Sequence, residues 1–284
     1  LKAIGSRVKN TGLTLTTVYF GGGTPTILSA EQLDRVCTAV KENFDLSRLK
    51  EYTVEAGRPD TITREKLKVL RKHNISRISI NPQTLNDEVL EAIGRKHTAK
   101  EIEDCFLTAR EEGFDNINMD LIAGLPGDTV AGFCSTIDRI VKMNPENVTV
   151  HTLSIKRSAK YGANPEERKK ALELTQQVGQ MVSYAQKKLM ENGFMPYYLY
   201  KQRNTLGNLE NTGYCKKGCE GRYNIYIMDE TQTILAAGGG AVSKLKSNRT
   251  GKLERIFNYK YPFEYVEHFD EVLKRKDRMV TFFE

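Results

Sequence analysis

Short runs of β-branched and aromatic residues alternate with helical stretches over the first 155 residues of the chain. The runs at 14–20, 51–55, 77–80, 116–122 and 147–153 favour strands, and the segments between them carry apolar residues at helical spacing. Strands that recur after helices in this rhythm indicate βαβ units and a parallel sheet. Right-handed crossovers would curl such a series into an open or closed α/β barrel.

The sequence changes character after residue 155, where a polar stretch with Gly162 and Pro165 predicts a connecting segment. We therefore expect a barrel domain over residues 1–157 and a smaller α+β domain over residues 158–284. In the second domain the patterns predict an amphipathic helix at 167–192, strands at 195–200 and 222–228, and a last helix at 262–276.

The composition of the chain limits which classes of partner are expected. The 43 basic and 36 acidic residues give a net charge of +7, which indicates either a solvated lysine-rich surface or attraction of a polyanion such as a polycarboxylate. Basic residues do not interleave with aromatic ones, and no zinc-finger or RNA-binding signature is present, so no nucleic-acid partner is expected. The longest weakly polar run, residues 234–242, is far shorter than a membrane span of about 20 residues, so no membrane partner is expected either.

The five cysteines are an odd and scattered set: Cys37, Cys105, Cys134, Cys215 and Cys219. This set argues against a disulfide framework and for a reducing cytoplasm, and the absence of an apolar leader agrees with a cytoplasmic protein. Cys215 and Cys219 have the spacing of two metal ligands, but an incidental reduced pair is the simpler interpretation. We expect no metal site within the chain.

Three polar residues fall near the carboxyl ends of predicted strands, namely Glu55, Gln83 and Asp120. Active sites of α/β barrels are built at these ends. In addition, Asn118 and Asp120 alternate with apolar residues, and a polar stripe in a parallel strand is costly unless it lines a cavity or finds partners. A structural hydrogen bond explains any one of them equally well. The three together favour a shared site.

Gly21, Gly22 and Gly23 follow the first predicted strand and precede a helix. Glycines let a ligand reach backbone N–H and C=O groups, although a tight turn would also use them. The loop is not the dinucleotide fingerprint, because Thr26 stands in place of the third glycine, and it lacks the residues of a Walker loop. Three glycines before Thr24-Pro25-Thr26 form a more selective pattern than a lone Gly-x-Gly-x-x-Gly.

In combination, these motifs resemble the oxygen-independent coproporphyrinogen III oxidases, which are radical S-adenosylmethionine (SAM) enzymes. A coproporphyrinogen dehydrogenase-like branch of that family is especially similar, and the resemblance spans nearly the whole chain. It implies an α/β fold, namely a partial (β/α)6 radical SAM barrel with a smaller C-terminal α+β domain. The segments that carry the resemblance are 19–26, Glu55, Gln83, Arg95, 120–127, 54–60, 207–214, 223–225 and 238–245.

The resemblance also implies a set of SAM-binding residues. By analogy the glycine loop holds the methionine end of SAM, and Glu55 accepts hydrogen bonds from both ribose hydroxyls. Other residues match positions that bind a second SAM, although Arg95 is also compatible with an ordinary surface arginine, and Asn81-Pro82-Gln83 departs from the Gly-x-Gln of better-known members. The implied residues are Gly21, Gly22, Gly23, Thr24, Glu55, Gln83, Arg95 and Asp120, with Ser154 and Val242 as weaker backbone contacts.

The implied cofactors are SAM and a [4Fe–4S] cluster. In this family the reduced cluster splits SAM to a 5′-deoxyadenosyl radical, which starts the oxidative decarboxylation of coproporphyrinogen III propionates to vinyl groups in heme and porphyrin biosynthesis. The resemblance therefore also implies a tetrapyrrole substrate, an electron donor and an oxidoreductase that is a monomer. The family's cluster motif lies upstream of the glycines, and none of the 20 residues before Gly21 is a cysteine. We therefore expect a carboxy-terminal part of the enzyme that is inactive by itself, with catalytic residues unassigned.

Three alternatives stay open. The first is another tetrapyrrole radical SAM enzyme, such as a heme-opening methyltransferase. The second is a non-catalytic heme carrier of the same fold, for which His73, His97, His151 and His268 are the candidate axial ligands. The third is an unrelated α/β barrel with chance glycine loops.

Overall fold

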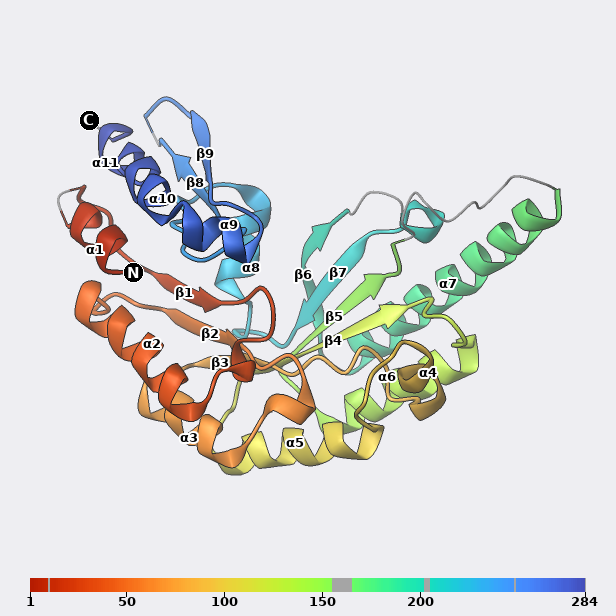
Figure 1. The fold of residues 1–284 in the computed structure, drawn as a ribbon. Coiled ribbons are helices and arrows are strands. Elements are labelled where there is room, and N and C mark those ends of the chain that lie inside the picture. The colour runs from red at the N-terminus through yellow and green to blue at the C-terminus, as the bar shows by residue number, and fades with distance from the viewer. Residues whose placement is uncertain (10, 155–164, 202–204, 248, 284) are drawn as a thin grey trace. The chain divides into compact units, whose positions relative to one another are not determined.

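The chain forms two compact units in the computed structural model (Figure 1). Unit 1 comprises residues 1–18, 34–51 and 222–284, and unit 2 comprises residues 19–33 and 52–221. The predicted domain boundary near residue 157 lies outside the described residues and stays a prediction. The structure describes residues 1–9, 11–154, 165–201, 205–247 and 249–283, without the side chains of residues 165–171 and 206.

A seven-stranded sheet in the order β1-β2-β3-β4-β5-β7-β6 organises the fold. Strands β2 to β5 pair in parallel, whereas β7 pairs antiparallel with both β5 and β6. This arrangement confirms the predicted α/β fold with a partial barrel. The strands are β1 Thr17–Phe20, β2 Glu51–Glu55, β3 Arg77–Ser79, β4 Ile117–Ala123, β5 Asn147–Thr152, β6 Met195–Tyr200 and β7 Asn211–Cys215.

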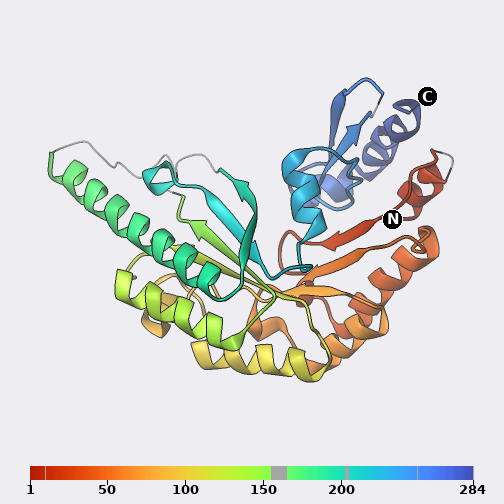
Figure 2. The same cartoon turned by 180° about the vertical axis from the view of Figure 1, so that it is seen from behind.

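The helices of unit 2 cover one face of the sheet, as both views show (Figures 1 and 2). Side-chain caps define where several of them begin. Thr98 forms a complete capping box with Glu101, and Thr129 accepts a hydrogen bond from the backbone of Gly132. No helix among the described residues has the length and apolarity needed to cross a bilayer. The helices are α3 Arg64–Lys72, α4 Asp87–Ala92, α5 Ala99–Glu111, α6 Val130–Met143 and α7 Pro165–Glu191, with short 3₁₀ turns at Pro25–Ile27, Pro59–Thr61 and Leu206–Asn208.

Unit 1 is built around a β-hairpin and short helices. Its core contains Ile4, Leu245, Ile256 and Met279, which are nearly inaccessible to solvent. Helix α2, Ala30–Asn43, has its C-terminal part in this unit. The other elements are α1 Lys2–Val8, α8 Arg222–Asp229, β8 Val242–Lys246, β9 Leu253–Phe257, α9 Pro262–Glu267, α10 Phe269–Arg275 and α11 Arg278–Thr281.

Two sequence predictions in the C-terminal region are wrong. The strand predicted at 222–228 is helix α8, because the Glu51 carboxylate accepts hydrogen bonds from the backbone N–H groups of Arg222 and Tyr223 and so stabilises a helix N-terminus there. The helix predicted at 262–276 is broken at His268 into α9 and α10. By contrast, the helix predicted at 167–192 and the strand at 195–200 are confirmed as α7 and β6.

Gly213 controls how the antiparallel edge of the sheet packs. It lies on β7 between Thr149 of β5 and Tyr198 of β6. A Cβ atom at position 213 would overlap the Tyr198 ring. The missing side chain therefore lets Tyr198 cross β7, so that its hydroxyl reaches Thr149 Oγ1 at 3.4 Å.

Replacing Gly213 with Ala should lower the free energy of unfolding by about 1–3 kcal/mol, because the added methyl group overpacks the Tyr198 ring. Urea unfolding of the chain measures this change. A Gly179→Ala control in α7, where an added Cβ meets nothing, should raise stability by up to about 1 kcal/mol. Equal effects of the two substitutions would contradict the packing role of Gly213.

Candidate functional site

The glycine loop after β1 is joined to the end of β2 by the Glu55 carboxylate. The Gly22 N–H donates to Glu55 Oε2 at 3.2 Å, and the Tyr19 hydroxyl donates to Oε1. A Cβ at Gly21 would overlap Tyr19 Cε1 and lie 2.9 Å from Glu55 Oε1, so a larger residue would have to move one of these side chains. The structure thus brings three predicted site residues together at one place.

The next residues of the loop leave their backbone accessible. A Cβ added at Gly22 or Gly23 would meet no atom within 4 Å, and Gly22 adopts a φ of 106°, which side chains rarely allow. Thr24 lies close to Gly57, which follows β2, because a Cβ at Gly57 would be 3.9 Å from Thr24 Oγ1. A ligand can therefore reach peptide groups of this loop beside Glu55.

Glu55 is held in an environment that favours its neutral form. Burial raises the pKa of Glu55 above its usual value, and this effect outweighs the hydrogen bonds from Tyr19 and Gly22 that lower it. The negative charge of Asp120 raises the pKa of Glu55 further. The two carboxylates, which come from strands separated by β3, therefore interact electrostatically.

Asp120 does not lie at the carboxyl end of its strand, as the sequence analysis predicted, but at the centre of β4. Strand β4 has the predicted length but continues past Asp120 to Ala123, where it pairs with Thr152 of β5, and Gln83 pairs with Leu121 in an isolated bridge. The Gln83 N–H donates to the Asp120 carbonyl at 3.0 Å, and the Ile122 N–H donates to the Gln83 carbonyl at 2.9 Å. Gln83 itself has a φ of 69°, so its contact with β4 is made by a left-handed backbone.

The Asp120 side chain belongs to a polar network on one face of the sheet. Because side chains alternate along a strand, Asn118 and Asp120 lie on the face opposite to the fully buried Met119 and Leu121. Asn118 Nδ2 donates to Asp120 Oδ1 and to Ser79 Oγ, both at 2.8 Å. The predicted polar stripe therefore finds partners across strands.

His151 completes this network from β5. Its Nε2 lies 3.8 Å from Asp120 Oδ1, and the Tyr200 hydroxyl lies 2.7 Å from its Nδ1. Burial favours the neutral form of Asp120, but His151, Asn118 and Thr149 outweigh it and hold the pKa of Asp120 below its usual value. Sequence reasoning considered His151 only as a heme ligand. The alternation of Thr149 and His151 with valines is the signal that places it on the polar face.

Three further predicted residues are Ser154, Arg95 and Val242. Ser154 pairs with Thr205 in an antiparallel bridge. Arg95 follows α4, is half-buried, and makes no hydrogen bond or ion pair with Glu55, Gln83 or Asp120 within the described part of the chain. Val242 begins β8 in unit 1. Their assignments stay predictions.

The residues present do not fit an iron–sulfur cluster. Such a cluster needs several cysteine thiolates, and no three Cys, His, Asp or Glu side chains converge within the described ranges. Burial raises the pKa of Cys215 to about 12, so it remains a thiol at neutral pH. The Cys215 and Cys219 pair is thus no cluster site. The glycine loop and Glu55, by contrast, offer the open backbone and the acceptor oxygens that an adenosyl ligand requires.

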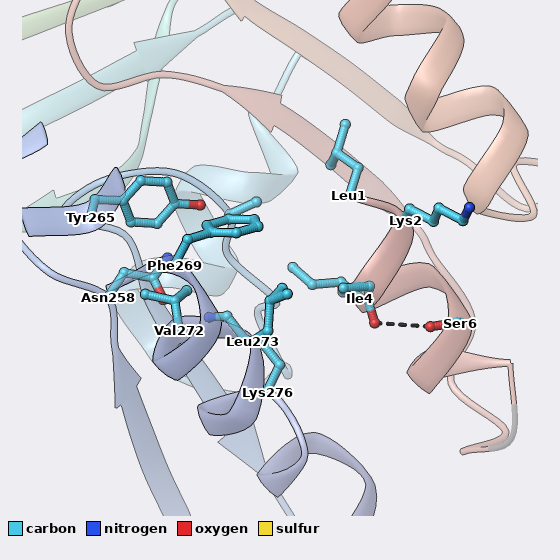
Figure 3. A pocket seen from close by; sticks show the side chains of 12 residues that line it. Leu1, Lys2, Ile4, Ser6, Asn258, Tyr265, Phe269, Val272, Leu273 and Lys276 are labelled. Atoms are coloured by element: carbon cyan, nitrogen blue, oxygen red, sulfur yellow. Dashed lines mark hydrogen bonds between the residues drawn. The ribbon is translucent and has the colours of Figure 1, made fainter. Parts of the chain in front are cut away.

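A separate cavity of about 420 Å³ lies within unit 1 between α1 and α10 (Figure 3). Phe269, Val272 and Leu273 line it together with the buried Lys276, which donates to the Ala236 carbonyl at 3.2 Å. Burial lowers the pKa of Lys276 to about 8. No predicted site residue lines this cavity.

The chain matches the radical SAM superfamily over residues 4–140. It is 47% identical over 277 residues to the oxygen-independent coproporphyrinogen-III oxidase-like protein HemZ of Bacillus subtilis, a match that covers 97% of this chain and 55% of that protein. The chain therefore contains a radical SAM domain.

Further comparisons agree with this assignment. The chain is 31% identical over 245 residues to the heme chaperone HemW of Lactococcus lactis, covering 86% of this chain and 61% of that protein. The fold matches that of coproporphyrinogen III oxidase from Escherichia coli, with a TM-score of 0.67 at 22% identity over 95% of this chain and 61% of that chain. The chain spans between 55% and 61% of the length of these relatives.

The raised pKa of Glu55 has a consequence for stability. The folded state binds the Glu55 proton more tightly than the unfolded state, so stability contributed by the neutral group is lost as the pH rises from the usual value of 4.5 through the folded pKa. Glu55→Gln stays neutral and avoids this loss. Its free energy of unfolding, relative to the unsubstituted chain, should therefore increase between about pH 4 and pH 7.

Urea unfolding at several pH values measures this difference. Glu173→Gln on the exposed surface of α7 is the matched control for the substitution itself. The account is contradicted if the free energy of unfolding of Glu55→Gln, relative to the unsubstituted chain, stays constant or decreases as the pH rises. Burial would then not control the pKa of Glu55.

Proposed function

We propose that the full-length protein is a radical SAM enzyme that binds SAM against the glycine loop and Glu55 and acts on a tetrapyrrole, with oxidative decarboxylation of coproporphyrinogen III as the reaction. The contact between the Gly22 N–H and Glu55 supports this proposal most directly, because it places a carboxylate beside open backbone. The relation to the coproporphyrinogen-III oxidase-like protein HemZ supports the substrate class.

The proposal gives each group of the loop a binding role. No neighbouring atom would crowd a side chain at Gly22 or Gly23, so the Gly22 carbonyl and the carbonyl and N–H groups of Gly23 would hold the charged methionine end of SAM. Glu55 has lone pairs beyond those used by Tyr19 and Gly22, and would accept hydrogen bonds from the two ribose hydroxyls. Bound SAM would supply the 5′-deoxyadenosyl group, and the sheet face would position it and exclude water.

Asp120 would bind a second ligand on the same face. It is held as an anion by His151 and Asn118, in contrast to Glu55, so it suits a partner that carries an ammonium group or hydroxyl donors. The net charge of +7 is compatible with a substrate that bears several propionates.

A second candidate function is that of a heme carrier, because the chain is also 31% identical to the heme chaperone HemW of Lactococcus lactis. The four histidines differ in their surroundings. His97 is buried with its Nε2 unpartnered among the described residues, His268 packs against Tyr259, and His151 contacts Asp120. Tight binding of heme by the full-length protein, without turnover of SAM, would favour the carrier.

Glu55→Gln in the full-length, cluster-loaded protein should weaken SAM binding by about 10-fold or more, because the amide keeps only one acceptor oxygen for the two ribose hydroxyls. Equilibrium binding under anaerobic conditions measures the affinity. Glu173→Gln, an equal change of charge on an exposed helix, should leave it unchanged. Equal SAM affinity of Glu55→Gln and wild type would refute the role of Glu55.

The substrate assignment has its own test. Wild-type protein incubated anaerobically with SAM, a reductant and coproporphyrinogen III should release CO2 and form the vinyl product, which mass spectrometry detects. Cleavage of SAM without a change in the mass of coproporphyrinogen III would show that the protein is a radical SAM enzyme that acts on another substrate. Methyl transfer to heme would identify the methyltransferase alternative.

A further inference from the structure

Asp120, His151 and Tyr200 form a line of polar contacts that connects the centre of the sheet to its last strand. His151 Nε2 lies 3.8 Å from Asp120 Oδ1, while its Nδ1 lies 2.7 Å from the Tyr200 hydroxyl. The three residues come from β4, β5 and β6, and the His151 and Tyr200 rings meet edge to face with centroids 5.9 Å apart. The imidazole is therefore oriented from both of its nitrogens.

The sheet is built to let Tyr200 reach this position. Strand β7 lies between β5 and β6, and Gly213 of β7 leaves room for the Tyr198 ring to cross it. The Tyr200 ring stands parallel to that of Tyr198, with an interplanar angle of 6° and centroids 6.3 Å apart. The two tyrosines thus project over β7 toward β5 as a pair.

The protonation states define the direction of the hydrogen bonds. Burial raises the pKa of Tyr200 to about 12, so its hydroxyl keeps its proton at neutral pH and can donate to His151 Nδ1. When Tyr200 donates, a neutral imidazole carries its proton on Nε2, which faces the Asp120 carboxylate. Asn118 donates to the same Asp120 oxygen from the other side.

We propose that His151 and Tyr200 are positioning residues, which hold the Asp120 carboxylate as an oriented anion for a ligand of the SAM class that carries an ammonium group and hydroxyls. This inference rests on the proposed function, since it assigns the ligand to the same face of the sheet. Neither residue needs to touch the ligand. Tyr200 fixes the His151 ring, and His151 fixes Asp120.

A double-substitution cycle in the full-length, cluster-loaded protein tests this chain of contacts. Tyr200→Phe removes only the hydroxyl, and it should raise the KM for SAM in 5′-deoxyadenosine formation by about 10-fold, with a smaller effect on kcat. In an Asp120→Asn background, the same Tyr200→Phe change should alter KM by less than about 2-fold, because the residue that it positions no longer carries a charge. His151→Gln should behave in the same way.

The matched control is Tyr184→Phe, which removes a tyrosine hydroxyl that donates to Asp138 at 2.9 Å in the contact between α7 and α6. It should change neither KM nor kcat. Thermal unfolding of each variant establishes that the protein remains folded.

The possible outcomes distinguish a failure of the inference from a failure of the proposed function. An equal loss from Tyr200→Phe in both backgrounds would show a purely structural role and overturn the inference. An unchanged KM in Tyr200→Phe, with normal SAM turnover by the wild type, would overturn the inference and leave the proposed function intact. Failure of the wild type to bind or cleave SAM would overturn the proposed function, and the inference with it.

Discussion

Two carboxylates on one face of a parallel sheet are the constraint on which the site depends. Glu55 and Asp120 both lie where burial disfavours a charge, yet their surroundings treat them differently. Glu55 receives hydrogen bonds from a hydroxyl and a peptide N–H, which do not compensate for its burial. Asp120 is contacted by Asn118 and His151, and these contacts do compensate for its burial. One face of the sheet thus carries two carboxyl groups of opposite tendency. The pKa of Glu55 is raised, and the pKa of Asp120 is lowered.

This contrast explains why the loop and the strands carry their particular residues. Glycine at position 21 lets the Glu55 carboxylate approach the backbone, and glycine at position 213 lets the Tyr198 ring of the edge strand approach β5. In both places a side chain has been omitted so that a polar or aromatic group can occupy the space. The buried alternate residues of β4, such as Met119 and Leu121, provide the rigid layer behind the polar face.

The sequence predicted the alternation of strands and helices well because most boundaries are set locally. The capping residue Thr98 and the period-two alternation of β4 can both be recognised without tertiary contacts. Helix α8 could not be predicted in this way, since its N-terminus is stabilised by Glu51 from a distant strand. The position of Asp120 at the centre of β4 could not be predicted for the same reason. Its central position and its partner His151 become apparent only when β4 and β5 are in register, because the two strands pair as far as Ala123.

The location of bound SAM in the full-length protein tests the central claim most directly. In a crystal structure of the SAM-loaded protein, the account predicts the ribose hydroxyls within hydrogen-bond distance of the Glu55 carboxylate and the methionine end along Gly22 and Gly23. Density for SAM at another place, with Glu55 still bonded only to Tyr19 and Gly22, would contradict it.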